Sequence, residues 1–246
     1  MNTLKALSAL LTYPSRELQE AIPQIAGIIG NCETLDDGAR KQLRLLTDDL
    51  ANGDLYELQE SYTDLFDRTR SLSLHIFEHI HGESRDRGQA MVDLQNHYAE
   101  HGLEIGASEL PDYIPLFLEF LSTLPAAEAS DLLGQPINIL SAIGERLAKR
   151  NSPYQGVFQA LVSLSAEFPE HEAVQEILAR PDIDANDLEA LDAAWEEEEV
   201  RFGPGADTSC KDEIVAKVRA GCRPAPGVKV ANNKPVIQFS AGGQNA

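Results

Sequence analysis

Cysteine is scarce in this sequence of 246 residues. Its three cysteines, Cys32, Cys210 and Cys222, are widely separated and form no CxxC pair. An odd number of isolated cysteines is typical of the reducing cytosol, and it supports neither a disulfide framework nor a structural zinc site. We therefore expect a cytoplasmic protein.

Long hydrophobic runs are also missing. No apolar stretch approaches the roughly 20 residues that span a bilayer. The apolar run Ala6–Leu11 near the N-terminus is followed at once by Tyr13-Pro14, so it is too short for the hydrophobic region of a signal peptide. The sequence therefore predicts no cleaved signal and no stable membrane insertion.

Positive charge is the third shortage. The 20 Lys and Arg residues face 40 Asp and Glu residues, a net charge of −20. The excess lies in residues 1–200, with a balance of −24, whereas residues 201–246 carry +4. A domain with this much negative charge repels nucleic acid and anionic lipid and attracts basic protein segments. We expect no nucleic-acid partner.

Helical periodicity recurs along most of the chain. Apolar residues follow the i, i+3, i+4 pattern in 55–66, in 113–124 and in 154–168, the last stripe ending at Phe168. Ser15 is placed to cap one helix, and Thr34–Asp37 resembles a capping box that opens another. Strand signals are nearly absent. This pattern predicts an all-α fold, a single multi-helix, bundle-like domain.

The composition changes after residue 202. Residues 203–246 are punctuated by glycine and proline and have few large apolar side chains. Such a segment buries too little surface to offset its ordering entropy, although a short helix at about 210–219 fits the pattern. We predict a helical domain over 1–202, with a last helix around Leu188–Trp195, and a mostly disordered, flexible tail over 203–246.

Motifs of catalysis and nucleotide binding are lacking. The sequence has no G-x-S-x-G elbow, no P-loop and no G-x-G-x-x-G. His75 and His79, like His97 and His101, are spaced i, i+4, which places two imidazoles on one helix face. The order around Glu78 is not H-E-x-x-H, so we favour structural histidines over a metalloenzyme using His75, His79 and Glu78. We expect no catalytic residue, bound cofactor or metal.

Two stretches have the chemistry of recognition. The segment Gly82–Gly88 holds Arg85, Arg87 and two carboxylates, which fits either a salt-bridged connection or a loop whose guanidiniums bind a partner. The aromatic stripe 113–120 is mostly core by its pattern. Asp112, Tyr113 and Glu119 would also suit the lip of an apolar groove, beside Leu116 and Phe117, that takes an amphipathic peptide helix.

These stretches together resemble one family. The block 77–91, FEHIHGESRDRGQAM, closely resembles the signature of the NarJ family, the assembly chaperones or delta subunits of membrane-bound respiratory nitrate reductases. Three further blocks agree in order, namely 62–67, 109–113 and 191–198. The likeness covers about residues 4 to 202.

The resemblance implies an all-helical, cytoplasmic protein of the redox-enzyme maturation type that is not an enzyme. Such a chaperone binds the N-terminal segment of the apo catalytic (alpha) subunit and holds it off the membrane. It supports insertion of the molybdenum cofactor, with cofactor delivery proteins as further partners, and is then released. The alternative is a proofreading chaperone for the twin-arginine leader of another molybdoenzyme, against which the long 77–91 block argues.

The resemblance and the groove pattern together suggest which residues bind the client peptide. Glu109, Pro111 and Asp112 align with a Glu-x-Pro-x-Asp-His-like hinge motif of the wider superfamily, but Tyr113 stands where that motif has histidine. A role for that imidazole is not expected here, whereas Tyr113 keeps an aromatic face and a hydroxyl. The predicted client-binding residues are Tyr62, Leu65, Phe66, Phe77, Glu78, Arg85, Arg87, Pro111, Asp112, Tyr113, Leu116 and Glu119.

Overall fold

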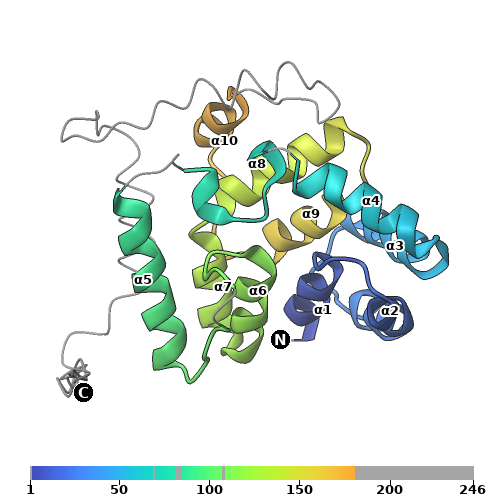
Figure 1. The fold of residues 1–246 in the computed structure, drawn as a ribbon, viewed down its shortest axis with the longest axis horizontal. Coiled ribbons are helices and arrows are strands. Elements are labelled where there is room, and N and C mark those ends of the chain that lie inside the picture. The colour runs from blue at the N-terminus through green and yellow to red at the C-terminus, as the bar shows by residue number, and fades with distance from the viewer. Residues whose placement is uncertain (1, 69, 81–84, 107–108, 181–246) are drawn as a thin grey trace, which may run out of the picture.

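The computed structural model describes residues 2–68, 70–80, 85–106 and 109–180, with no side-chain placement at 85 and 86. Up to residue 106 the helices are α1 (Asn2–Leu10), α2 (Arg16–Gly30), α3 (Asp37–Asn52), α4 (Leu55–Phe66), η1 (Arg70–Leu72), η2 (Ile76–Glu78) and α5 (Arg85–Glu100). From residue 109 they are α6 (Ile114–Thr123), α7 (Ala126–Gly134), α8 (Ile137–Lys149), α9 (Gln155–Leu164) and α10 (His171–Leu178) (Figure 1). The all-α prediction is confirmed. The expected helix at 188–195 and tail at 203–246 lie outside the described residues.

Helix α9 lies at the centre of the bundle (Figure 1). It packs against α3 and α8, and it also contacts α1 and α7. Its Val157, Phe158 and Leu161 have no exposed surface. Gly156 allows α3 to approach closely, because a Cβ at this position would lie 2.6 Å from the Cβ of Gln42. The core is therefore built around one short helix whose apolar side is fully buried.

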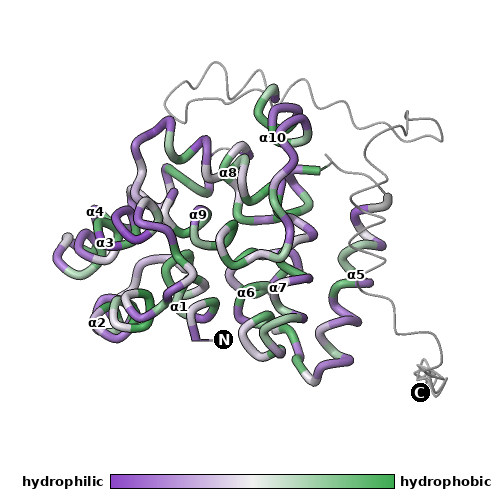
Figure 2. The backbone as a smooth tube through the Cα atoms, turned by 180° about the vertical axis from the view of Figure 1, so that it is seen from behind, coloured by the Kyte–Doolittle hydropathy of each residue, from purple (hydrophilic) through white to green (hydrophobic). Residues whose placement is uncertain are grey.

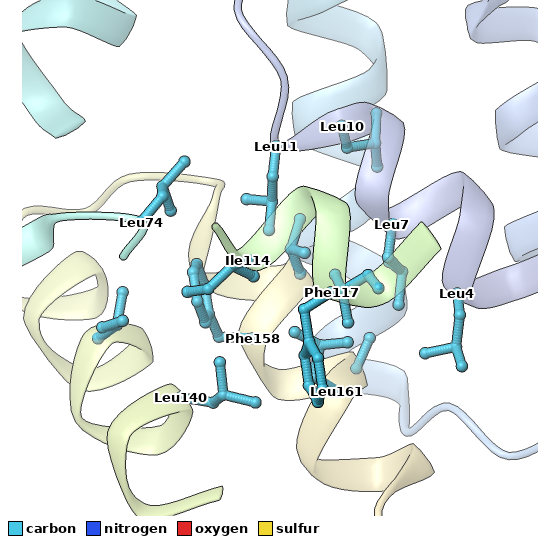
Figure 3. Close-up of a cluster of buried hydrophobic side chains, with 14 of the residues drawn as sticks. Leu4, Leu7, Leu10, Leu11, Leu74, Ile114, Phe117, Leu140, Phe158 and Leu161 are labelled. Carbon is cyan, nitrogen blue, oxygen red and sulfur yellow. The ribbon is translucent and has the colours of Figure 1, made fainter. Parts of the chain in front are cut away.

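Helix α1 supplies much of the rest of that core. Leu4, Leu7 and Leu11 are almost fully buried, as their spacing predicts, and α1 packs against α2 and α6. The Ser8 hydroxyl donates to the Pro115 carbonyl at 2.7 Å and so ties α1 to the start of α6. Figure 3 shows these leucines gathered in one cluster with Leu74, Ile114, Phe117, Leu140, Phe158 and Leu161.

One of the two predicted helix caps is confirmed and the other is wrong. Ser15 caps α2 by accepting from the Leu18 amide at 3.2 Å, which confirms that prediction. The predicted capping box at 34–37 is wrong, because the Asp36 carboxylate caps α3 by accepting from the Ala39 amide at 2.7 Å. The hydroxyl of Thr34 instead contacts the Cys32 sulfur at 3.1 Å.

The predicted stripe over 154–168 is too long. Helix α9 ends at Leu164, and Phe168 is 86% exposed. A tertiary contact ends the helix, since Ser165 is extended and the next amide, of Ala166, donates to the Ser130 carbonyl of α7 at 3.1 Å. Helices α7 and α10, of nine and eight residues, were not anticipated from the sequence. Both are too short to show a clear period.

Helix α5 lies at the edge of the molecule, as Figures 1 and 2 show from opposite sides. Its inner side buries Leu94 and Tyr98, and the Tyr98 hydroxyl donates to the Pro111 carbonyl at 2.7 Å. The helix stops before Gly102, whose φ of 79° suits a residue lacking Cβ. The bond between Tyr98 and Pro111 joins α5 to the segment before α6.

Candidate functional site

Two segments that are distant in the sequence are paired edge to edge. The Ile76 amide donates to the Asp112 carbonyl at 3.1 Å, and the Ile114 amide donates to the Leu74 carbonyl at 2.8 Å. These bonds form an antiparallel bridge between His75 and Tyr113. The bridge places η2, where the 77–91 block begins, beside the end of the 109–113 block.

Asp112 anchors this bridge from inside. Its side chain has no exposed surface. One carboxylate oxygen accepts from the Phe77 amide at 3.1 Å, and the other lies 3.2 Å from Nδ1 of His75. The hydrogen bond to Asp112 raises the pKa of His75. These partners offset the cost of burying a carboxylate, so Asp112 shapes the site rather than standing at its lip.

A cavity of about 440 Å³ opens beside the bridge. Four of the predicted client-binding residues line it, namely Tyr62 and Phe66 from α4, Glu78 from η2, and Tyr113. We call it the bridge pocket. The sequence did not single out its other lining residues for peptide binding; these are Tyr13, Asp67, Arg68, Arg70, Ser73, Leu74 and His75.

Aromatic rings form one wall of the bridge pocket. Tyr62 packs on Phe66 with ring centroids 4.9 Å apart, and Tyr13 meets Tyr62 edge-on at 5.5 Å. Burial raises the pKa of Tyr62, whose hydroxyl donates to the Leu11 carbonyl at 2.7 Å. Tyr62 is therefore a fixed, neutral group, whereas Tyr13 is half exposed, at 50%.

The charges near the pocket are largely compensated. Arg87 Nη2 lies 3.6 Å from Glu78 Oε1, and Arg68 Nε lies 3.0 Å from Asp64 Oδ1. The pairing of Arg87 with Glu78 agrees with the salt-bridged alternative for the arginine-rich segment. The side chain of Arg85 lies outside the described part. Pairs of this exposure contribute about 0–1 kcal/mol each, so they leave the groups available to a partner.

The remaining predicted residues do not gather at this pocket. Leu65 lines a different recess, and the buried Phe77 borders a small apolar cavity of about 20 Å³. Pro111 is buried, and Leu116 is half-buried. Glu119 is exposed on α6, 3.9 Å from Nζ of Lys5. The prediction thus identified part of the pocket together with side chains spread over several other surfaces.

His79 holds a structural position. His79 is buried, and its Nε2 donates to the Ser73 carbonyl at 2.7 Å. Burial lowers the pKa of His79 to about 4, so this ring is neutral near pH 7. Within residues 2–68, 70–80, 85–106 and 109–180, no three His, Cys, Asp or Glu side chains come together as metal ligands.

The buried His79 makes stability sensitive to acid. Its folded pKa of about 4 lies below the ordinary 6.5, so the unfolded chain binds the proton first and stability falls as pH drops through this range. At pH 5 the loss attributable to this ring is roughly 2 kcal/mol. The raised pKa of His75 has the opposite effect on stability. Its stabilising contribution is complete at low pH and is lost as the pH rises.

Urea unfolding at pH 7 and pH 5 tests this prediction. His79→Gln keeps a donor for the Ser73 carbonyl and does not titrate, so the variant should lose less stability between the two pH values than the parent chain. Equal losses in both proteins would show that His79 is not the acid-sensitive group.

The all-helical architecture fits a chaperone domain. Residues 32–160 match the family described as nitrate reductase delta subunit. The nitrate reductase molybdenum cofactor assembly chaperone NarJ of Escherichia coli (strain K12) is 40% identical over 215 residues, 87% of this chain and 90% of that protein. The probable assembly chaperone NarW of the same strain is 38% identical over 213 residues, 85% of this chain and 87% of that protein.

A more distant relative extends the comparison beyond one organism. The probable nitrate reductase molybdenum cofactor assembly chaperone NarJ of Bacillus subtilis (strain 168) is 28% identical over 173 residues, 70% of this chain and 93% of that protein. The chain therefore belongs to the nitrate reductase delta subunit family, a family of assembly chaperones and not of enzymes. No helix in the described part of the chain has the length and apolarity needed to cross a membrane.

Proposed function

We propose that this chain is a system-specific cytoplasmic chaperone for a membrane-bound respiratory nitrate reductase. It binds the N-terminal segment of the apo catalytic subunit and keeps that subunit off the membrane. It supports molybdenum cofactor insertion, with cofactor delivery proteins as further partners, and then leaves. The observation that carries this proposal is the 40% identity to a named assembly chaperone across 87% of the chain.

The bridge pocket is the proposed client site. It gathers residues from three of the four blocks that resemble the family, and its ring wall offers apolar faces to the side chains of a peptide helix. The exposed edge of Tyr13 and the half-buried ring of Tyr113 lie at its surface. The surrounding acidic body attracts a basic peptide. Because the client must be released, weak to moderate affinity suits this role.

Calorimetry with a synthetic peptide tests the site. A peptide of the first 15 or so residues of the cognate catalytic subunit should bind the full chain, and added salt should weaken binding by screening. Tyr13→Ala removes an aromatic anchor and should raise Kd by about tenfold, the scale of a moderate hot spot. Tyr56→Ala is the matched control, since Tyr56 is 80% exposed on α4 and does not line the pocket.

Three results would contradict the proposal. Equal effects of Tyr13→Ala and Tyr56→Ala would place the client elsewhere on the chain. No binding at high peptide concentration would remove the N-terminal segment as client, and tighter binding of a twin-arginine leader would favour the proofreading alternative.

A further inference from the structure

A second recess lies on the other side of α4. It has a volume of about 610 Å³ and forms where the end of α3, the start of α4 and the loop before α9 meet. Helix α4 separates it from the bridge pocket, because Leu58 and Leu65 line this recess while Tyr62 and Phe66 line the other. We call it the corner groove. Its apolar part is formed by Leu46, Leu50, Leu58, Leu65, Pro153 and Tyr154.

The rim of the corner groove is acidic. Asp48 and Asp49 from α3, together with Asp54 and Glu57 at the start of α4, line it and are exposed. Among the described residues that line it, none is lysine or arginine. Burial and then the charge of Asp49 raise the pKa of Tyr154, which shows that the rim charge acts on the apolar floor. Such a groove complements a segment with a narrow apolar stripe flanked by cations.

The chain itself contains such a segment. Residues 211–219 read KDEIVAKVR and lie within 201–246, whose net charge is +4 against −24 for residues 1–200. At a helical period, Ile214, Val215 and Val218 share one side, with Lys217 and Arg219 on either edge of that stripe. Glu213 falls on the side opposite the stripe, Asp212 lies beyond Arg219, and Lys211 lies over the stripe at the first position of the segment. The stripe with its two flanking cations complements the apolar floor and acidic rim of the corner groove.

The end of the described chain lies near the groove. Arg146, in the last turns of α8, donates to the carbonyls of Ile177 at 2.9 Å and Arg180 at 3.4 Å. Six residues after Arg146 comes Ser152, which lines the groove, and six residues span at most about 20 Å even when fully extended. About 30 residues separate Arg180 from Lys211, and even a fraction of their fully extended reach of roughly 100 Å covers the gap.

We propose that residues 211–219 of the same chain dock in the corner groove as an amphipathic helix. Ile214, Val215 and Val218 cover its apolar floor, and Lys217 and Arg219 face its acidic rim. Tethering raises the effective concentration of the segment to about the millimolar range, so a contact too weak to persist between separate molecules is populated within one chain. The docked segment keeps an acidic, apolar surface from capturing other basic helices. This inference does not depend on the client or on the bridge pocket.

Paramagnetic relaxation in the full-length chain tests the docking directly. A nitroxide is attached to Cys222 in a chain carrying Cys32→Ser and Cys210→Ser. The amide signals of residues 48–58, Ser152 and Tyr154 should lose most of their intensity, while those of α7 stay sharp. Asp49→Lys should abolish the effect, and adding Lys217→Glu to Asp49→Lys should restore it. Asp131→Lys, on the exposed side of α7, is the matched charge control and should change nothing.

Each other outcome overturns the proposal. Uniform broadening, or none, would show that the segment does not dock. In a mixture of isotope-labelled chain without nitroxide and unlabelled chain with nitroxide, broadening of the groove signals would show that the occupant belongs to a second copy. Persistence of the effect in Asp49→Lys would place the contact elsewhere. Client-peptide calorimetry is a separate measurement, so failure here leaves the proposed function standing.

Discussion

Asp112→Ala should lower the free energy of unfolding by about 3–5 kcal/mol, because it removes two hydrogen bonds to a buried carboxylate, each contributing about 1.5–3 kcal/mol. The substitution leaves the Phe77 amide and the His75 ring without the buried oxygens that accept their hydrogen bonds at 3.1 and 3.2 Å. The bridge between the two segments would loosen with them. Urea unfolding at pH 7 measures the loss, and the same variant should bind the client peptide weakly.

Two companion variants make this prediction specific. Asp112→Asn keeps an oxygen for the Phe77 amide and should lose less than Asp112→Ala. Asp131→Ala removes an exposed carboxylate from α7 and should change stability by less than about 0.5 kcal/mol. If Asp112→Ala and Asp131→Ala have the same effect, the buried carboxylate does not hold the bridge.

Phe158→Ala should destabilise the chain by about 3–5 kcal/mol, as large-to-small changes in a closed core do. Phe158 has no exposed surface and lies in the central cluster of Figure 3. Helix α8 packs close to it, because a Cβ at Gly144 would lie 3.0 Å from the Cβ of Phe158, so the surroundings have little freedom to collapse into the cavity.

Phe168→Ala is the natural control, since it removes the same side chain at 86% exposure. It should change the free energy of unfolding by less than about 0.5 kcal/mol. Thermal or urea unfolding of the two variants side by side provides the comparison. Similar losses would mean that the aromatic stripe of 154–168 is buried throughout, contrary to the structure.

These two phenylalanines show what the sequence could predict of the fold. The helical period placed both on one stripe, and for Phe158 that was right. The period could not reveal that α9 ends at Leu164, because the end is set by the bond between Ala166 and Ser130 of another helix. Similarly, Thr34 and Asp36 both suit a helix start, and in the structure Asp36 is the cap.

The candidate site was predictable only in part for a similar reason. Tyr62 and Phe66 are spaced i, i+4 and share one face of α4, so the pattern brought them together correctly. Leu65 belongs to the corner groove, which nothing in its local sequence indicates. The pairing of 74–76 with 112–114 joins distant segments through backbone atoms, and it turned Asp112, a carboxylate expected at a lip, into a buried anchor.

The molybdenum content of the client enzyme tests the central claim most directly. A catalytic subunit of the cognate nitrate reductase is purified from cells lacking every chaperone of this family, with or without the full chain co-expressed. Elemental analysis should find close to one molybdenum per catalytic subunit with the chain present and little without it. Equal molybdenum in both preparations would contradict a role for this protein in cofactor insertion.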